Sequence, residues 1–282
     1  MLNCDEALKL LNGLNSNPMK RADIIEYVRV KGTIAVFAYG SLIWNPFEHV
    51  EQIISGCSLI GYTKGFLCQD FIYRGTTDCT GLTMGLKPCE NSFVKGYLLM
   101  SGIHQAVPFI EAFVKRETPI DVDDTKMDIY TYDFLPVLMP DEKTVEWALT
   151  CLVKCHSQFC ISIALSIEQQ AEIIDRSYGI NGTNFQYLHN TLNTYRKLAL
   201  LDTFTEEMER LYTAVLLYRH RLVEQDRQWL DTFDQLPTKN ERQLAIKSRK
   251  IKRIRMRPRK LLSRMYSVAP TTIPTYHRIL SV

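Results

Sequence analysis

The stretch Thr33–Pro46 constrains the fold of this chain more than any other segment. It begins with the apolar run Ile34–Ala38, which has the length of a strand and is rich in strand-forming residues. Gly40 comes two residues after this run, and a glycine there indicates a turn or a close approach of two backbones. A strand that ends in such a turn can leave consecutive N–H groups unpaired, which creates a concave site for anions. On composition alone, a buried strand followed by an ordinary turn is the simpler interpretation.

Strand-like runs continue through the first half of the chain. They lie at residues 33–38, 57–66, 68–73, 82–87 and 93–99, separated by turns that contain glycine, and two more are expected at 127–135 and 145–153. This alternation predicts a barrel or a strongly curved sheet.

Helical patterns precede, interrupt and follow these strands. They lie at residues 3–30, at 104–116 and at 203–236. Ser166 and Gln169 form a capping box that starts a further helix, and Gly179 is placed to end it. Asn184 can cap the helix that follows. Helices combined with a sheet in this order predict an α+β fold.

The composition is that of a chain that can bury a sizeable core. Of 282 residues, 46% are hydrophobic and 23% are charged, which is ordinary for a soluble globular protein. Acidic residues interrupt any apolar start, and no run approaches the roughly 18 apolar residues of a membrane span, so we expect a cytoplasmic protein. None of the eight cysteines forms a CxxC pair. Cys151, Cys155, His156 and Cys160 fit no common zinc spacing, so buried free thiols are expected and a metal site is not.

The charge is unevenly distributed along the chain. Residues 241–282 hold twelve Lys or Arg and one acid, so the first 240 residues have a net charge of −8 although the whole chain has +3. Within this tail, Lys247–Arg264 carries ten positive charges and no acid. Such a segment attracts an acidic membrane surface or an acidic partner, and no clear nucleic-acid motif accompanies it. A solvated helix face, or a tail that folds onto the acidic body, explains the pattern equally well.

Several segments resemble one known enzyme family. Phe37-Ala-Tyr-Gly-Ser-Leu-Ile-Trp-Asn-Pro46 is similar to the opening motif of the ChaC-type γ-glutamylcyclotransferases, F-G-Y-G-S-L-I-W-x-P. The wider superfamily shares only Y-G-S-L, so Ile43 and Trp44 point toward the ChaC branch. Arg74–Asp78 resembles the family's Q-G-S-T-D segment. Just before it, Gln69-Asp70 stands where the family usually has paired arginines, which leaves the pocket wall open to change.

The family's catalytic acid/base has a counterpart here. ChaC-like proteins carry L-D-x-R-E-K-G-G-Y after a helix, and Arg116-Glu117 keeps the R-E pair of that motif at the end of the predicted helix 104–116. The resemblance therefore implies that Glu117 is catalytic. Thr118–Asp121 replaces K-G-G-Y, so the loop that follows is remodelled. Without the resemblance, Glu117 is explained as a solvated carboxylate at a helix end.

A last motif follows the predicted helix that begins at Ser166. The family's G-P-S-G-x-N-x-E-Y-L is matched with the same spacing at Gly182, Asn184, Tyr187 and Leu188. Tyr187 is explained equally well as a core residue or as a pocket residue, because a buried tyrosine usually finds a hydrogen-bond partner in either role.

Together these segments imply a fold, a reaction and a site. The implied fold is a γ-glutamylcyclotransferase-like curved mixed β-barrel flanked by helices, over residues 33–200. We expect it to be preceded by a helical addition at 1–32 and followed by a C-terminal helix at 201–240 and the basic tail at 241–282. The implied substrate-binding residues are those of the opening motif and the last one, namely Tyr39, Gly40, Ser41, Leu42 and Tyr187.

The implied substrate is glutathione, cleaved to 5-oxoproline and Cys-Gly. In this reaction the substrate's own α-amino group attacks its side-chain carbonyl, so no serine or cysteine nucleophile, metal or cofactor is required. Two alternatives remain open from the sequence: cyclotransfer on another γ-glutamyl amide, or an inactive relative recruited through its basic tail.

Overall fold

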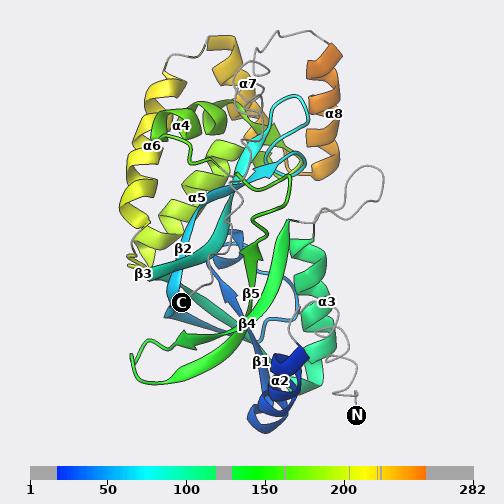
Figure 1. The fold of residues 1–282 in the computed structure, drawn as a ribbon. Helices are drawn as coiled ribbons and strands as arrows, with labels where there is room; N and C mark the ends of the chain where they lie inside the picture. Colours follow the sequence, from blue (N-terminus) through cyan, green and yellow to red (C-terminus); the bar gives the residue numbers. More distant parts are fainter. Residues whose placement is uncertain are drawn as a thin grey trace, which may run out of the picture.

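Five strands close into a barrel at one end of the molecule, as Figure 1 shows. The computed structural model describes residues 18–118, 129–161, 163–202, 204–220, 222 and 224–251. The strands are β1 (Thr33–Ala38), β2 (Gln52–Asp70), β3 (Gly81–Gly102), β4 (Tyr130–Leu138) and β5 (Val145–Val153), and their order around the barrel is β1-β3-β2-β4-β5. Four of the pairings are antiparallel, whereas β1 and β5 are parallel and meet at Val36 and Leu149. The predicted mixed barrel is therefore confirmed.

Two long strands replace four of the predicted short ones. Because β2 ends at Asp70, it covers the run expected at 57–66 and the first half of the run expected at 68–73, and β3 covers those at 82–87 and 93–99. The pairing of β2 with β3 shifts register at three places along the ribbon. Gly56 and Gly61 have φ of +80° and +81°, a conformation that β-bulges use and that glycine adopts without a steric penalty. Gly56 and Gly61 therefore lie at bulges within one continuous ribbon of two strands.

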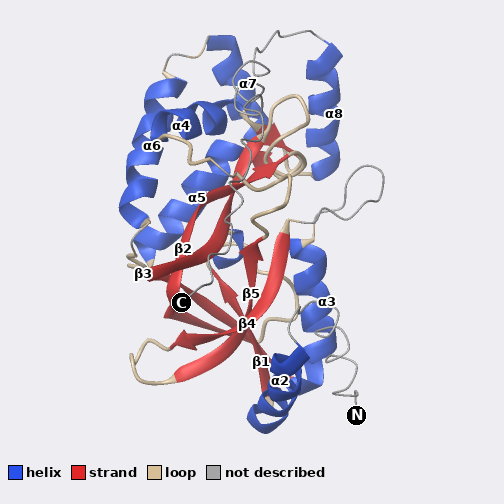
Figure 2. Ribbon diagram, in the orientation of Figure 1, coloured by secondary structure: helices blue, strands red, loops and turns tan. Residues whose placement is uncertain are grey.

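Helices lie beside the barrel and in a layer at its far end (Figure 2). They are α2 (Pro18–Lys31), α3 (Ala106–Glu117), α4 (Ile167–Arg176), α5 (Asn184–Lys197), α6 (Thr205–Arg219), α7 (Glu224–Asp234) and α8 (Lys239–Ile251), with short 3₁₀ turns η1 (Ser41–Ile43) and η2 (Ile103–Gln105) and a small hairpin β6 (Tyr178–Gly179) and β7 (Gly182–Thr183). α2 and α3 flank the barrel, and α4 to α8 form the distal layer. The first half of the predicted helical segment 3–30 lies outside the described residues.

The helix boundaries confirm one local prediction and correct two others. The capping box of Ser166 and Gln169 starts α4. Gly179 does not end that helix, because α4 stops at Arg176 and Gly179 pairs in the β6–β7 hairpin. Asn184 does not cap α5, because the hydroxyl of Thr183 accepts the capping hydrogen bond. The amide of Asn184 instead bonds both the N–H and the carbonyl of Leu82 at 2.7 Å, which ties α5 to β3.

The single helix predicted from Thr203 to Leu236 is two helices, α6 and α7. The apolar face of α6, with Met208, Leu211 and Val215, packs in the main core that fills the barrel and the helical layer. The apolar face of α7 packs in a second, smaller core formed by Tyr178, Leu230, Phe233 and Ile246. One straight helix cannot present one face to two cores, so the chain turns between them.

The second core also holds α8, which contains the first residues of the predicted basic tail. The guanidinium of Arg249 is buried, lies 3.8 Å above the ring of Trp229 and donates to Asp226 at 2.7 Å. This part of the tail therefore folds onto the acidic helix α7, as one of the open explanations expected. Residues 252–264 of the basic segment lie outside the described residues. No helix in the described part of the chain has the length and apolar character of a bilayer span.

Candidate active site

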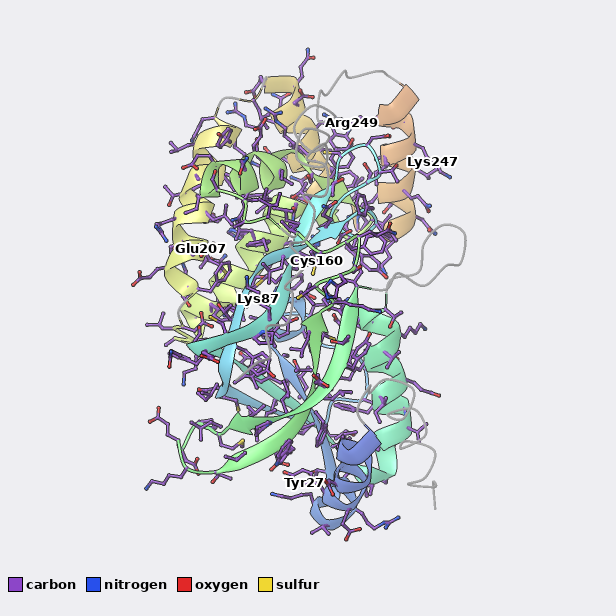
Figure 3. The ribbon with its side chains drawn as sticks, viewed as in Figure 1. Tyr27, Lys87, Cys160, Glu207, Lys247 and Arg249 are labelled. Carbon is purple, nitrogen blue, oxygen red and sulfur yellow. The ribbon has the colours of Figure 1, made fainter. Side chains whose placement is uncertain are left out.

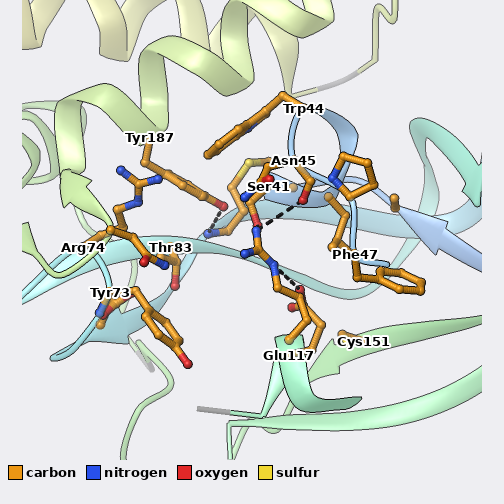
Figure 4. Close-up of a pocket in the computed structure, with 18 of the residues that line it drawn as sticks. Ser41, Trp44, Asn45, Phe47, Tyr73, Arg74, Thr83, Glu117, Cys151 and Tyr187 are labelled. Carbon is orange, nitrogen blue, oxygen red and sulfur yellow. Dashed lines mark hydrogen bonds and ion pairs between the residues drawn. The ribbon is translucent and has the colours of Figure 1, made fainter. Parts of the chain in front are cut away.

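A cavity of about 730 Å³ opens between the barrel and the helical layer. Every site residue expected from the sequence lines it, namely Tyr39, Gly40, Ser41, Leu42, Glu117 and Tyr187. Figure 4 shows how the turn after β1, the end of α3 and the start of α5 bring these distant segments together. The structure thus gathers three sequence motifs around one hollow.

One wall of the cavity is the turn that follows β1 and contains η1. The short η1 turn is closed by hydrogen bonds from Ile43 N–H to the Gly40 carbonyl at 3.1 Å and from Trp44 N–H to the Ser41 carbonyl at 3.3 Å. As at any helix start, the first N–H groups lack an internal partner. Nothing in the described part of the chain accepts from the N–H of Ser41 or Leu42. The turn therefore presents two unpaired donors at the cavity.

The side chain of Tyr39 braces this wall from behind. Its hydroxyl donates to the carbonyl of Cys151 on β5 at 3.0 Å, and its own carbonyl accepts from the hydroxyl of Tyr195 on α5 at 2.9 Å. Both bonds are buried, so the turn is held from two sides. The backbone at Tyr39 is thereby fixed, and its hydroxyl is already engaged within the barrel.

Tyr187 is both a core residue and a cavity residue. Its ring packs edge-on against Trp44 and Phe66, with centroid distances of 6.2 Å in each case. Its hydroxyl accepts from the N–H of Met84 at 3.2 Å and lies 3.4 Å from the place that a β-carbon on Gly40 would occupy. The two interpretations left open by the sequence are both partly right. The described residues give this hydroxyl one donor, the N–H of Met84, and no acceptor for its own proton, which is therefore available to a bound substrate.

Glu117 is the last residue of α3, and its side chain is 17% exposed at the cavity. Burial raises the pKa of Glu117, although Arg116 lowers it. Arg116 also lines the cavity, with its Nε 3.9 Å from Oε1 of Glu117 and its Nη2 3.4 Å from the Ser41 hydroxyl. Glu117 is therefore a carboxylate that accepts a proton more readily than an exposed one, and water still reaches it.

Asp70, one of the two residues that stand where the family usually has paired arginines, has a clear structural role. Asp70 accepts from the N–H groups of Ile72 and Tyr73 at 2.8 and 2.7 Å, which holds the turn after β2. That turn directs Arg74 into the cavity, where its Nη1 donates to the side-chain oxygen of Gln186 at 3.1 Å. Burial lowers the pKa of Arg74 to about 10, so it remains a cation at neutral pH. A cationic wall is therefore present, supplied from a different position.

The sequence indicates Arg74 only as part of a motif, and it does not predict that Arg74 or two cations of α8 line the cavity. Lys239 and Arg242 line the same cavity, and they lie three residues apart on the first turn of the helix. That spacing places both on one helix face, and Pro237 just before them marks the helix start. The spacing indicates that the two side chains share a face, but not that this face meets the cavity, because that depends on how α8 packs against the second core.

The cysteine and histidine set does not converge on a common point. Cys151 is buried beside the cavity, whereas Cys155 is exposed. Over the residues that the structure describes, no group of three or more His, Cys, Asp or Glu side chains is arranged to hold a metal ion.

Comparison with solved structures defines the class of fold. Two crystal structures of a yeast γ-glutamylcyclotransferase specific to glutathione superpose with TM-scores of 0.59 and 0.53, at 17% and 19% identity. They cover 68% and 67% of this chain and 99% and 100% of theirs. The barrel and its helices therefore have the γ-glutamylcyclotransferase-like fold.

Comparison of sequences then places the chain within that class. The family model described as ChaC-like protein matches residues 34–218. A Schizosaccharomyces pombe protein named glutathione-specific γ-glutamylcyclotransferase is 31% identical over 180 residues, which is 60% of this chain and 86% of that protein. An Escherichia coli protein of the same name is 24% identical over 176 residues, 61% of this chain and 69% of that protein. The chain belongs to the ChaC-like family.

Proposed function

We propose that this protein is a γ-glutamylcyclotransferase that cleaves glutathione to 5-oxoproline and Cys-Gly. The observation that carries the proposal is the placement of the Glu117 carboxylate, with its raised pKa, in the same cavity as two unpaired backbone N–H groups. The similar proteins from two organisms that bear the name of this activity support it.

The substrate supplies the nucleophile, so the cavity must mainly fold it into a bent conformer. The α-amino nitrogen attacks the γ-carbonyl carbon and forms the lactam C–N bond, and the amide C–N bond to cysteine breaks. Holding the two reacting groups in contact can contribute up to about 7–11 kcal/mol in ideal intramolecular cases. A cavity walled by the braced η1 turn and the aromatic side chains of Trp44 and Tyr187 is suited to that task.

Glu117 would perform both proton transfers. Its carboxylate accepts a proton from the α-ammonium group, which frees the amine to attack, and the resulting acid delivers that proton to the leaving nitrogen as the amide bond breaks. The attacking nitrogen loses a second proton when it becomes the lactam N–H, and the freed amino group of Cys-Gly takes up one proton in turn. The raised pKa of Glu117 suits both steps. A higher pKa makes the carboxylate a stronger base for the first transfer, and it keeps the carboxyl group protonated until it donates to the leaving nitrogen. No net proton is gained or lost by the enzyme over the cycle.

The N–H groups of Ser41 and Leu42 and the hydroxyl of Tyr187 would bind negative charge. The γ-carbonyl oxygen becomes an oxyanion when the amine attacks, and the substrate also carries an α-carboxylate next to that amine. Donors held in place before the reaction stabilise such charge without reorganising. Gly40 keeps this region open, since a β-carbon there would approach the Tyr187 hydroxyl to 3.4 Å.

The test is mass-spectrometric detection of 5-oxoproline after incubation with glutathione. Glu117→Gln should lower turnover by about 10²–10⁴-fold, the usual contribution of a general acid/base. Glu111→Gln is the matched control, because it removes a carboxylate from the exposed side of the same helix. Equal turnover by the wild type and Glu117→Gln would assign the proton transfers to another group. If a folded wild type makes no 5-oxoproline, a panel of other γ-glutamyl amides would separate a change of substrate from loss of activity.

The basic segment Lys247–Arg264 adds a second, smaller proposal. Its ten positive charges support a cytoplasmic protein that associates peripherally with an acidic membrane surface or an acidic partner. Truncation after residue 251 keeps α8 and removes most of this charge, so it should abolish co-sedimentation with anionic vesicles. Binding that persists in the truncated chain, or that does not weaken with added salt, would contradict the electrostatic explanation.

A further inference from the structure

Three cations surround a part of the cavity that the proton transfers do not need. Arg74 lies on the side of Tyr187 away from Glu117 (Figure 4), with its guanidinium 5.5 Å from the centre of the tyrosine ring. Lys239 and Arg242 enter the same cavity from α8. The cavity therefore extends beyond the reacting groups, and its extension is positively charged.

α8 presents these side chains from a fixed position. At its start, Glu241 accepts from the N–H and the hydroxyl of Thr238 at 3.0 and 2.7 Å, and the Thr238 hydroxyl accepts from the N–H of Glu241 at 3.2 Å. At its other end, Arg249 lies on Trp229 and bonds Asp226. Between them, Ile246 is buried in the second core. Thr238 and Glu241 cap the helix locally, whereas Ile246 and Arg249 hold it against the second core and α7, so the first turn of α8 is a wall of the cavity.

The cations of this wall are only partly compensated by acids of the protein. Arg242 lies close enough to Arg74 that the two repel each other, and repulsion from Arg242 adds to burial in lowering the pKa of Arg74. Asp70 and, less strongly, Asp234 oppose this effect, but both already accept hydrogen bonds: Asp70 from the N–H groups of Ile72 and Tyr73, and Asp234 from the N–H and the hydroxyl of Thr183 at 2.7 and 2.6 Å. The Nε of Arg242 is buried and has no acceptor among the residues that the structure describes. An anion between the two guanidinium groups would satisfy that donor and remove the repulsion.

A γ-glutamyl tripeptide carries such an anion as the carboxylate at its C-terminal end. One carboxylate adjoins the reacting amine, and the other ends the chain about two residues away, within a reach of roughly 3.3–3.6 Å per residue. We propose that Lys239 and Arg242, facing Arg74, bind the terminal carboxylate of the peptide and make the enzyme specific for substrates that end in one. This inference rests on the proposed cyclotransferase function and adds the part of the site that selects the leaving peptide.

This subsite would be particular to the present chain and not common to its relatives. The family model ends at residue 218, and α8 begins at Lys239. The reacting groups therefore lie within the matched region, whereas two of the three cations lie beyond it. Arg74 is inside the match, at the position where the family's segment usually has glutamine.

The test compares glutathione with its C-terminal amide, which lacks only the terminal charge. Arg242→Gln should raise KM for glutathione about 10- to 100-fold and leave kcat nearly unchanged, as expected when a charged hydrogen bond is lost. The same variant should have little effect on the amide. Arg242→Lys, which keeps the charge, should recover part of the loss. Lys247→Gln is the control, because Lys247 is exposed and points away from the body in Figure 3, whereas Arg249 faces α7.

Calorimetric binding of both peptides separates this inference from the proposed function. A wild type that binds glutathione but makes no 5-oxoproline refutes the function, and binding lost in Arg242→Gln for glutathione alone would still support the subsite. Equal losses for glutathione and its amide would overturn the subsite even if turnover is normal. Equal binding of both peptides by the wild type, or no binding of either, would overturn it as well.

Discussion

The two sides of the cavity are built in different ways. The side that we propose faces the reacting atoms, here called the reacting side, has backbone N–H groups after β1, one carboxylate at the end of α3 and one hydroxyl from α5. The side that we propose selects the rest of the substrate, here called the selecting side, has long cationic side chains from the turn after β2 and from α8. The first set is held by buried hydrogen bonds to the barrel, and the second depends on helices packed around a separate small core.

This difference suggests how one fold keeps its reaction while its substrates change. Groups that stabilise a transition state must be rigid, so they sit on the barrel and on short turns that the barrel braces. Groups that select a substrate can be supplied by elements added outside the barrel. Substitutions on the two sides should then have different kinetic signatures.

The largest effect is expected from Tyr187→Phe on the reacting side. Loss of a donor toward developing negative charge should lower kcat about 100-fold, and by the same factor for glutathione and for its C-terminal amide. Steady-state kinetics on both substrates measures this, with thermal unfolding as a control because the N–H of Met84 also loses its acceptor. A fall in kcat for glutathione but not for its amide would instead assign Tyr187 to the selecting side, and it would contradict the division between the two sides.

Arg249→Met should have an intermediate effect and should resemble a substitution on the selecting side. Removing the guanidinium from Trp229 and Asp226 should destabilise the protein by about 1–3 kcal/mol and loosen α8. KM for glutathione should rise about tenfold while kcat stays within about twofold, if α8 contributes one charged hydrogen bond. Hydrogen exchange in α8 measures the loosening. Faster exchange with an unchanged KM would show that α8 does not bind the substrate.

The smallest effect is expected from Arg116→Gln, and it concerns pH. Glu117 must be deprotonated to accept the first proton, so kcat/KM should fall as the pH drops through its pKa. Arg116 lowers that pKa, against the larger effect of burial that raises it. Removing the cation should therefore raise the pKa of Glu117 further and move the acidic limb of the pH profile to higher pH. If the acidic limb of the kcat/KM profile stays in place or moves to lower pH, a group other than Glu117 controls that limb.

Much of the reacting side could be predicted from the sequence because its features are local. The run Ile34–Ala38 followed by Gly40 defines a strand and a turn within a few residues, and the structure has that strand at Thr33–Ala38. The helix that places Glu117 was expected at 104–116 and lies at Ala106–Glu117. That these distant segments meet at one cavity came from the family resemblance and not from periodicity.

The selecting side could not be predicted because it depends on long-range packing. Arg242 belongs to a strongly basic tail and Lys239 lies just before it, and nothing local distinguishes Arg242, which lines the cavity, from Lys247, which faces solvent. The division of one predicted helix into α6 and α7 depends on two separate cores. The roles of Thr183 and Asn184 at the start of α5 were misassigned for the same reason, since Asn184 is used by β3 and so is not available as a cap.

The parallel pairing of β1 with β5 also has a consequence for the order of folding. β1 comes early in the chain, yet the hydroxyl of Tyr39 finds its acceptor only at Cys151, and its carbonyl finds a donor only at Tyr195. Contacts between residues so far apart form slowly, because a long loop must close first. During synthesis β1 can pair with β3 once residues 97–102 have emerged, but the turn after β1 lacks these two hydrogen bonds until residues 151 and 195 have emerged as well. We expect that no shorter nascent chain holds the reactive turn in place, so that catalysis would begin only with a nearly complete molecule.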